Sequence, residues 1–175
     1  SALGIYIDGD RERIPYEADA IINQLSHYTT DREYAMGRRS SEYLLEHPTW
    51  PTEWILQALI IAWNDYMYTG DKRSIEANYD ILKARTLQSL RRENGLISTT
   101  DDKVTTEEFR RSIRFDGLMR DIVDWPRCGD WPHGEDDHYH LTDYNTVVNA
   151  FHYRALMILQ QMAELTNRTD EAASL

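Results

Sequence analysis

Apolar side chains recur every three or four residues along most of this chain, which is the spacing of amphipathic α-helices. Two long segments, 52–69 and 145–166, are apolar around most of their circumference. The first has almost no polar face before Asn64, and the second has two adjoining apolar stripes. Such helices must be covered on more than one side. We therefore expect both to be inner helices that lie side by side.

The other predicted helices are shorter and amphipathic, and they alternate with the inner ones. Short turns separate consecutive helices, which predicts antiparallel hairpins and an all-α fold. The predicted segments are a helix over 16–28, a helix from an Asp31 N-cap to Pro48, a helix from an Asp71 N-cap to about Arg92, a hairpin-like bend over 93–100, a short helix beginning at 105–108 and the start of a further helix at 168–175.

Residues 114–144 predict a long loop that contains Trp125. Loops of this length in compact domains are usually functional. A metal site is an alternative for its acidic and imidazole side chains, but their spacing fits no common zinc or calcium pattern. We therefore predict a hydrated loop and no bound metal. The side chains concerned are His133, Glu135, Asp136, Asp137, His138 and His140.

Composition narrows the classes of protein. With 175 residues, 41% hydrophobic and 28% charged, the chain is typical of one globular core. A formal net charge of −11 repels nucleic acid and anionic membranes, so we expect neither as a partner. Cys128 is the single cysteine, which excludes an intrachain disulfide and leaves the cellular compartment open. The eleven Tyr and five Trp are suited to sugar faces.

Ionisable side chains are densest in residues 4–19, GIYIDGDRERIPYEAD. Crowded charges of both signs displace carboxylate pKa values, as acid catalysis requires. The Asp8-Gly9 pair predicts a turn and Pro15 an early helix position, so Glu12 is expected on a loop that leads into a helix. Composition alone favours a solvated charged loop. The ionisable side chains are Asp8, Asp10, Arg11, Glu12, Arg13, Tyr16, Glu17 and Asp19.

This stretch resembles the acid-bearing motif of the α-L-rhamnosidases, glycoside hydrolase family 78, in which Asp-x-x-x-Arg-x-Glu-Arg-x-Gly-Trp-x-Gly-Asp precedes a helix. The resemblance implies that Glu12 is the general acid and that Asp8 and Asp19 bind sugar hydroxyls. It also implies that Tyr16 stands in place of the motif's tryptophan. The chain departs from the pattern at Asp10, where an arginine is usual, and at two glycine positions, which implies that the sugar preference is shifted.

Further motifs continue the resemblance along the chain. They are T-E-W at 52–54, Y-T-G-D at 68–71, V-D-W at 123–125 and N-T-V-V-N-A-F at 145–151. They imply the six-hairpin (α/α)6 toroid of that family, with Trp54 and Trp125 lining the sugar subsite. A complete toroid needs roughly twice this length. Residues 1–175 are therefore expected to form a single partial domain, the N-terminal half of a longer catalytic domain, with the general base outside the chain.

The expected activity is that of an inverting glycosidase, without a cofactor, that releases terminal α-L-rhamnose or a related sugar from glycosides or polysaccharides. The segment alone is expected to be inactive, with its apolar faces covered by the missing half or by self-association. Three alternatives remain: a six-hairpin hydrolase for another sugar, an inactive sugar-binding relative, and a helical scaffold that binds partners. No fixed repeat period is visible, which counts against the scaffold.

Overall fold

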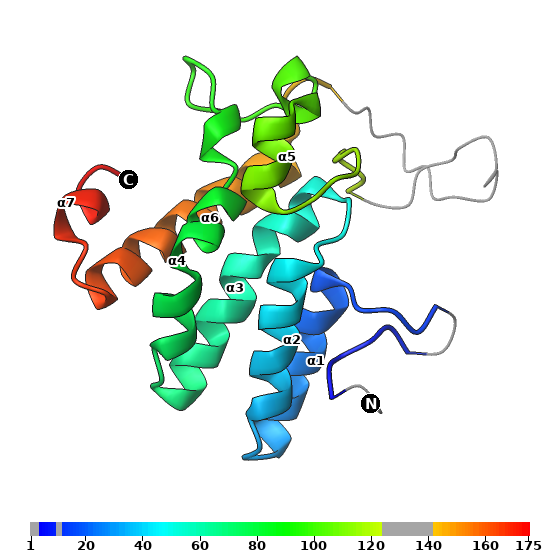
Figure 1. Ribbon diagram of the computed structural model, residues 1–175, viewed down its shortest axis with the longest axis vertical. Coiled ribbons are helices and arrows are strands. Elements are labelled where there is room, and N and C mark those ends of the chain that lie inside the picture. The colour runs from blue at the N-terminus through cyan, green and yellow to red at the C-terminus, as the bar shows by residue number, and fades with distance from the viewer. Residues whose placement is uncertain (1–3, 10–11, 124–141) are drawn as a thin grey trace.

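The computed structural model describes residues 4–9, 12–123 and 142–175 (Figure 1). Within these ranges the chain is helical, with isolated β-bridges and no β-strand, which confirms the all-α prediction. The helices are α1 (Glu17–Thr30), α2 (Ala35–Glu46), α3 (Thr52–Thr69), α4 (Arg73–Arg85), α5 (Glu107–Ile113), α6 (Thr146–Leu165) and α7 (Thr169–Ala172), with 3-10 turns η1 (Gln88–Leu90) and η2 (Asp102–Thr105). None of the helices in this described part is long and apolar enough to cross a membrane.

The helices are arranged as antiparallel hairpins around α3 (Figure 1). Helix α3 packs between α1 and α6, while α2 and α4 cover it from outside. Leu56 and Leu59 of α3 and Ile158 of α6 are fully buried in this interior. The prediction that the two inner helices lie side by side is therefore confirmed, because an apolar circumference can be covered only by neighbours on several sides.

The connections within hairpins differ from those between hairpins. The turns within hairpins are short, at 31–34, 70–72 and 166–168. A network centred on Arg38 ties α2 to the end of α3 and the following turn: its guanidinium contacts the carboxylates of Asp65 at 2.9 Å and Asp71 at 3.0 Å. Asp65 also accepts a 2.7 Å hydrogen bond from the Tyr28 hydroxyl. The connection between the first two hairpins, 47–51, and the segment that leads into α1 lie at the other end of the hairpins (Figure 1).

The predicted start of α2 at Asp31 is wrong by several residues, because a different carboxylate caps the helix. The Glu33 side chain accepts hydrogen bonds from the backbone N–H groups of Ala35, at 2.7 Å, and Met36, at 3.4 Å. Asp31 instead accepts from the N–H groups of Arg32 and Glu33 in the preceding turn. Both acidic residues suit a helix start, and tertiary packing decides between them.

Helix α4 also ends earlier than predicted, at Arg85 instead of near Arg92. Leu87 has a left-handed backbone, with φ of 59°, and its side chain is fully buried. Burial of this side chain offsets the cost of a conformation that breaks the helical hydrogen bonds. Beyond it, Arg91 and Ile97 form an antiparallel bridge, which confirms the predicted bend over 93–100.

His152 links the inner helix α6 to the end of α4 and makes folding sensitive to pH. Its ring is only 3% exposed, and Nδ1 lies 2.6 Å from the Thr86 carbonyl oxygen. Burial lowers the pKa of His152, and the charge of Arg91 lowers it further, whereas the Thr86 contact raises it. The unfolded chain therefore binds a proton below about pH 6.5 while the folded chain keeps a neutral ring, which favours unfolding.

We expect the free energy of unfolding to decrease as the pH falls from about 6.5 toward the lowered pKa of folded His152. The variant His152→Gln keeps an amide donor for the Thr86 carbonyl but cannot take up a proton in this range. The free energy of unfolding of this variant should therefore decrease less steeply with falling pH than that of the wild-type protein. Urea denaturation followed by circular dichroism, at steps between about pH 7.5 and pH 5, measures both slopes. Equal slopes in the two proteins would rule out His152 as the source.

Candidate active site

The segment that precedes α1, residues 4–9 and 12–16, is called the acid loop below. The N–H of Asp8 donates to the carbonyl oxygen of Ile14 at 2.7 Å, so the two described parts of the loop lie next to each other. Asp8 Oδ1 accepts a hydrogen bond from the N–H of the next residue, Gly9, at 2.7 Å, and the chain bends at Gly9. Glu12 is exposed to solvent at the tip. Its carboxyl group is accessible to a ligand.

Two aromatic residues hold the position of Glu12. The hydroxyl of Tyr16 donates a hydrogen bond to Glu12 Oε2. The Tyr16 ring in turn meets the Trp54 ring edge to face, with centroids 5.4 Å apart and planes at 68°. Trp54 lies in the first turn of α3, so the acid loop is tied through Tyr16 to the most deeply buried helix of the fold.

Three carboxylates gather at this place. Asp19, in the first turn of α1, is partly buried, and burial raises its pKa. The negative charges of Asp8 and Glu12 raise the pKa of Asp19 further, while a hydrogen bond to its own backbone lowers it. The structure thus brings together five of the residues predicted for the site, which are Asp8, Glu12, Tyr16, Asp19 and Trp54. The sixth, Trp125, lies outside the described residues, as does the whole segment 124–141 with its predicted metal-binding alternative.

A buried carboxylate beside Trp54 was not assigned a role from the sequence. Glu53 is 2% exposed, and it accepts hydrogen bonds from the N–H groups of Val123 at 2.7 Å and Ile122 at 3.5 Å. Burial raises the pKa of Glu53, and these hydrogen bonds lower it. Val123 has φ of 60°, which is strained for a β-branched residue and is held here by the Glu53 carboxylate. An acidic residue in the first turn of a largely apolar helix is the sequence signal for an unusual environment, but it does not identify the partner of Glu53.

The connection between α2 and α3 forms the other support of the site. Thr52 N–H donates to the Arg120 carbonyl at 3.0 Å, and Arg120 N–H donates to the Trp50 carbonyl at 3.3 Å. Glu17, noted in the sequence only as one more charge, is fully buried and accepts from both the N–H and the hydroxyl of Thr49. Backbone pairing and one buried carboxylate therefore fix this connection against α1.

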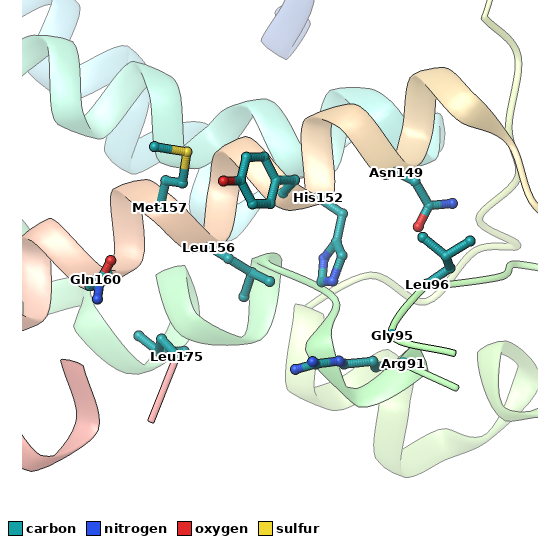
Figure 2. Close-up of a pocket in the computed structure, with 10 residues that line it drawn as sticks. Arg91, Gly95, Leu96, Asn149, His152, Leu156, Met157, Gln160 and Leu175 are labelled. Carbon is teal, nitrogen blue, oxygen red and sulfur yellow. The ribbon is translucent and has the colours of Figure 1, made fainter. Parts of the chain in front are cut away.

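A separate pocket of about 380 Å³ lies between α6 and the 91–96 turn (Figure 2). Figure 2 shows side chains of α6, among them His152, facing the turn that carries Arg91. None of its lining residues belongs to α1, α3 or the acid loop. The pocket is therefore not part of the candidate site. In residues 4–9, 12–123 and 142–175 no cluster of three or more His, Cys, Asp or Glu side chains is arranged to hold a metal ion.

The described part of the chain is a domain of helical hairpins with carboxylates and aromatic rings gathered at the start of α1 and α3. Comparison with protein families agrees: the bacterial alpha-L-rhamnosidase 6 hairpin glycosidase domain matches residues 1–174, and the chain belongs to this family. No curated protein and no solved structure matches the chain. The family resemblance noted in the sequence is confirmed, and the family implies a carbohydrate as the class of substrate.

Proposed function

We propose that the protein is an inverting glycosidase that releases terminal α-L-rhamnose or a closely related sugar, with Glu12 as general acid. The observation that carries the proposal is the hydrogen bond from Tyr16 to Glu12, made beside two further carboxylates. A general acid must be accessible and held in one orientation. Glu12 meets both requirements, because it is exposed while its carboxyl group is bound by Tyr16.

In the proposed reaction, protonated Glu12 gives its proton to the glycosidic oxygen as the bond from that oxygen to the anomeric carbon breaks. Water attacks the anomeric carbon from the opposite face, and a second carboxylate takes the proton of that water. Asp8 and Asp19 accept hydrogen bonds from ring hydroxyls. The rings of Tyr16 and Trp54 form an apolar wall, which suits the methyl group of a 6-deoxy sugar. Trp125 is proposed as a further wall.

The second carboxylate in an inverting enzyme lies about 6.5 to 9.5 Å from the acid. We propose that it lies outside this chain, which is then the N-terminal half of a longer domain. The surface of α6 supports this proposal, because Tyr153 is 66% exposed and Met157, one turn further along the helix, is 41% exposed. Large apolar side chains grouped on one helix face mark a surface that another element covers.

The isolated 175-residue chain is expected to self-associate and to hydrolyse no rhamnoside, since both its apolar face and its base would await the remainder of the domain. Light scattering and an aryl rhamnoside assay on the purified chain measure these properties. The variant with Tyr153→Ser and Met157→Ser should associate less. A monomer that turns over substrate would contradict the half-domain proposal, and Glu135 and Asp136 would then be the first candidates for the base.

The complete protein tests the proposed function directly. It is incubated with a panel of α- and β-linked aryl glycosides, and proton NMR follows the first sugar anomer to appear. We expect hydrolysis of the α-L-rhamnoside with the inverted anomer formed first. Preferred hydrolysis of another sugar would support the six-hairpin hydrolase alternative, which the departures at Asp10 and Pro15 favour. Binding of sugar without turnover would identify an inactive relative.

A further inference from the structure

A buried polar cluster adjoins the acid loop and takes no part in the proposed chemistry. It consists of Glu17 at the start of α1, Thr49 in the α2–α3 connection and Arg85 at the end of α4. Both charged side chains are 0% exposed. The Glu17 carboxylate accepts from the Thr49 N–H at 3.2 Å and from the Thr49 hydroxyl. Arg85 makes no direct hydrogen bond to Glu17, and buried charged groups are often less stable than apolar side chains of similar volume, so stability alone is a weak reason for this cluster.

The position of Glu12 depends on the start of α1. Glu12 to Ile14 are exposed, and Tyr16 donates a hydrogen bond to Glu12 from the end of the acid loop. At the end of the loop, Tyr16 is the N-cap residue of α1 and Glu17 is the first residue of the helix. The bonds from Thr49 to Glu17 fix this helix start, and they thereby fix the direction in which the Tyr16 side chain leaves the backbone.

The same bonds fix the distance from Tyr16 to Trp54. Thr49 lies just before α3, which begins at Thr52, and the backbone pairing with Arg120 restrains this connection. Glu17 therefore joins the element that carries Tyr16 to the element that carries Trp54. The contact between these two rings, with centroids 5.4 Å apart, depends on that junction.

Thr49 and Arg85 both favour the charged carboxylate of Glu17 in the interior. Burial raises the pKa of Glu17, while the hydrogen bond from the Thr49 hydroxyl and, to a smaller extent, the charge of Arg85 oppose this rise. The Arg85 guanidinium is itself held by a 2.9 Å hydrogen bond from Nη2 to the carbonyl oxygen of Leu45. A charged carboxylate offers acceptors to both Thr49 donors, which a neutral amide cannot do equally well with its single oxygen.

We propose that Glu17 is a positioning residue of the glycosidase: through Thr49 it fixes Tyr16, and Tyr16 orients Glu12 toward the departing oxygen. This inference rests on the proposed function. A displacement of about 1 Å at a catalytic group can cost about 100-fold in rate. A loosened Tyr16 should therefore slow the reactions that need proton transfer most.

The test uses the complete protein with Thr49→Val, which keeps the shape of Thr49 but removes its hydroxyl donor. With poor leaving groups we expect kcat to fall by about 10-fold, and with activated aryl glycosides by less than about 2-fold, while KM is unchanged. Thr49→Ser should restore normal kcat, because the hydroxyl is present again. Thr166→Val, which removes a comparable hydroxyl from the end of α6, is the matched control and should have no effect.

Tyr16→Phe tells positioning from a general loss of structure. If Glu17 acts through Tyr16, adding Thr49→Val to Tyr16→Phe should cause no further loss of kcat. Equal losses on poor and activated leaving groups, full additivity with Tyr16→Phe, or no loss at all would each overturn the inference. If Glu12→Gln nevertheless loses more activity on poor leaving groups than on activated ones, the proposed function would still stand. A wild-type protein that hydrolyses no glycoside would overturn both.

Discussion

In the complete protein, Glu12→Gln is expected to lower kcat for glycosides with poor leaving groups by about 10² to 10⁴-fold. The amide keeps the size of Glu12 and an oxygen that can accept from Tyr16, but it has no proton to give to the departing oxygen. Activated aryl glycosides should lose much less, because their leaving groups depart without full protonation. Binding of the free sugar should be retained. Steady-state kinetics on both substrate classes and calorimetric titration with the sugar measure these effects.

The matched control is Glu93→Gln, which makes the same chemical change in an exposed turn far along the chain. It should leave kcat and sugar binding at the wild-type values. Normal turnover of a poor leaving group by Glu12→Gln would remove Glu12 from the role of acid. The family membership of the chain does not depend on that outcome, since it rests on the match over residues 1–174.

The largest expected loss of stability follows removal of Glu17. Arg85 is fully buried, its Nε and Nη1 lack a hydrogen-bond partner among the described residues, and burial lowers its pKa to about 10. Glu17→Ala leaves this guanidinium without the carboxylate that balances it. Glu17 and Arg85 make no direct hydrogen bond, so the expected cost is that of leaving the Thr49 donors and a buried charge without the carboxylate, at least about 1 to 3 kcal/mol. Urea denaturation of the variant and the wild-type protein measures the difference.

A second substitution shows where that cost arises. In the double variant Glu17→Ala with Arg85→Met, no charge remains to be buried, so part of the lost stability should return. Glu76→Ala is the surface control, since Glu76 forms a 2.8 Å ion pair with Lys72 on the exposed side of α4. It should cost less than about 1 kcal/mol. If Glu17→Ala costs no more than Glu76→Ala, then Arg85 is balanced by other groups.

The sequence predicted the long elements well because their hydrophobic pattern is strong and continuous. Helices α3 and α6 begin and end close to the predicted positions, and Asn145 caps α6 through bonds to the N–H groups of Val147 and Val148. The shorter boundaries were predicted less well. At Asp31 and Glu33 two carboxylates competed for one helix start, and at Leu87 a buried side chain stabilised a left-handed backbone that no local pattern indicates.

The residues of the candidate site also differ in how far they could be predicted from the sequence. Glu12, Tyr16 and Asp19 lie within one short motif, so the sequence alone brings them close together. The supporting carboxylates act on residues remote in the chain: Glu17 binds Thr49, and Glu53 binds the backbone of Val123. Their partners are set by how helices pack, and a single sequence does not record that packing. Their roles could be assigned only from tertiary structure.

The unequal connections of the hairpins bear on how such a domain can diversify. Insertions or deletions in the turn 70–72 would separate Asp71 from Arg38, which holds it at 3.0 Å, so change there is costly. The side chains of Arg13 and Ile14 in the acid loop are exposed and can vary while the packing of α3 and α6 is preserved. Under the proposed function, evolution or a designed library can thus alter sugar preference at this loop without a new arrangement of the interior.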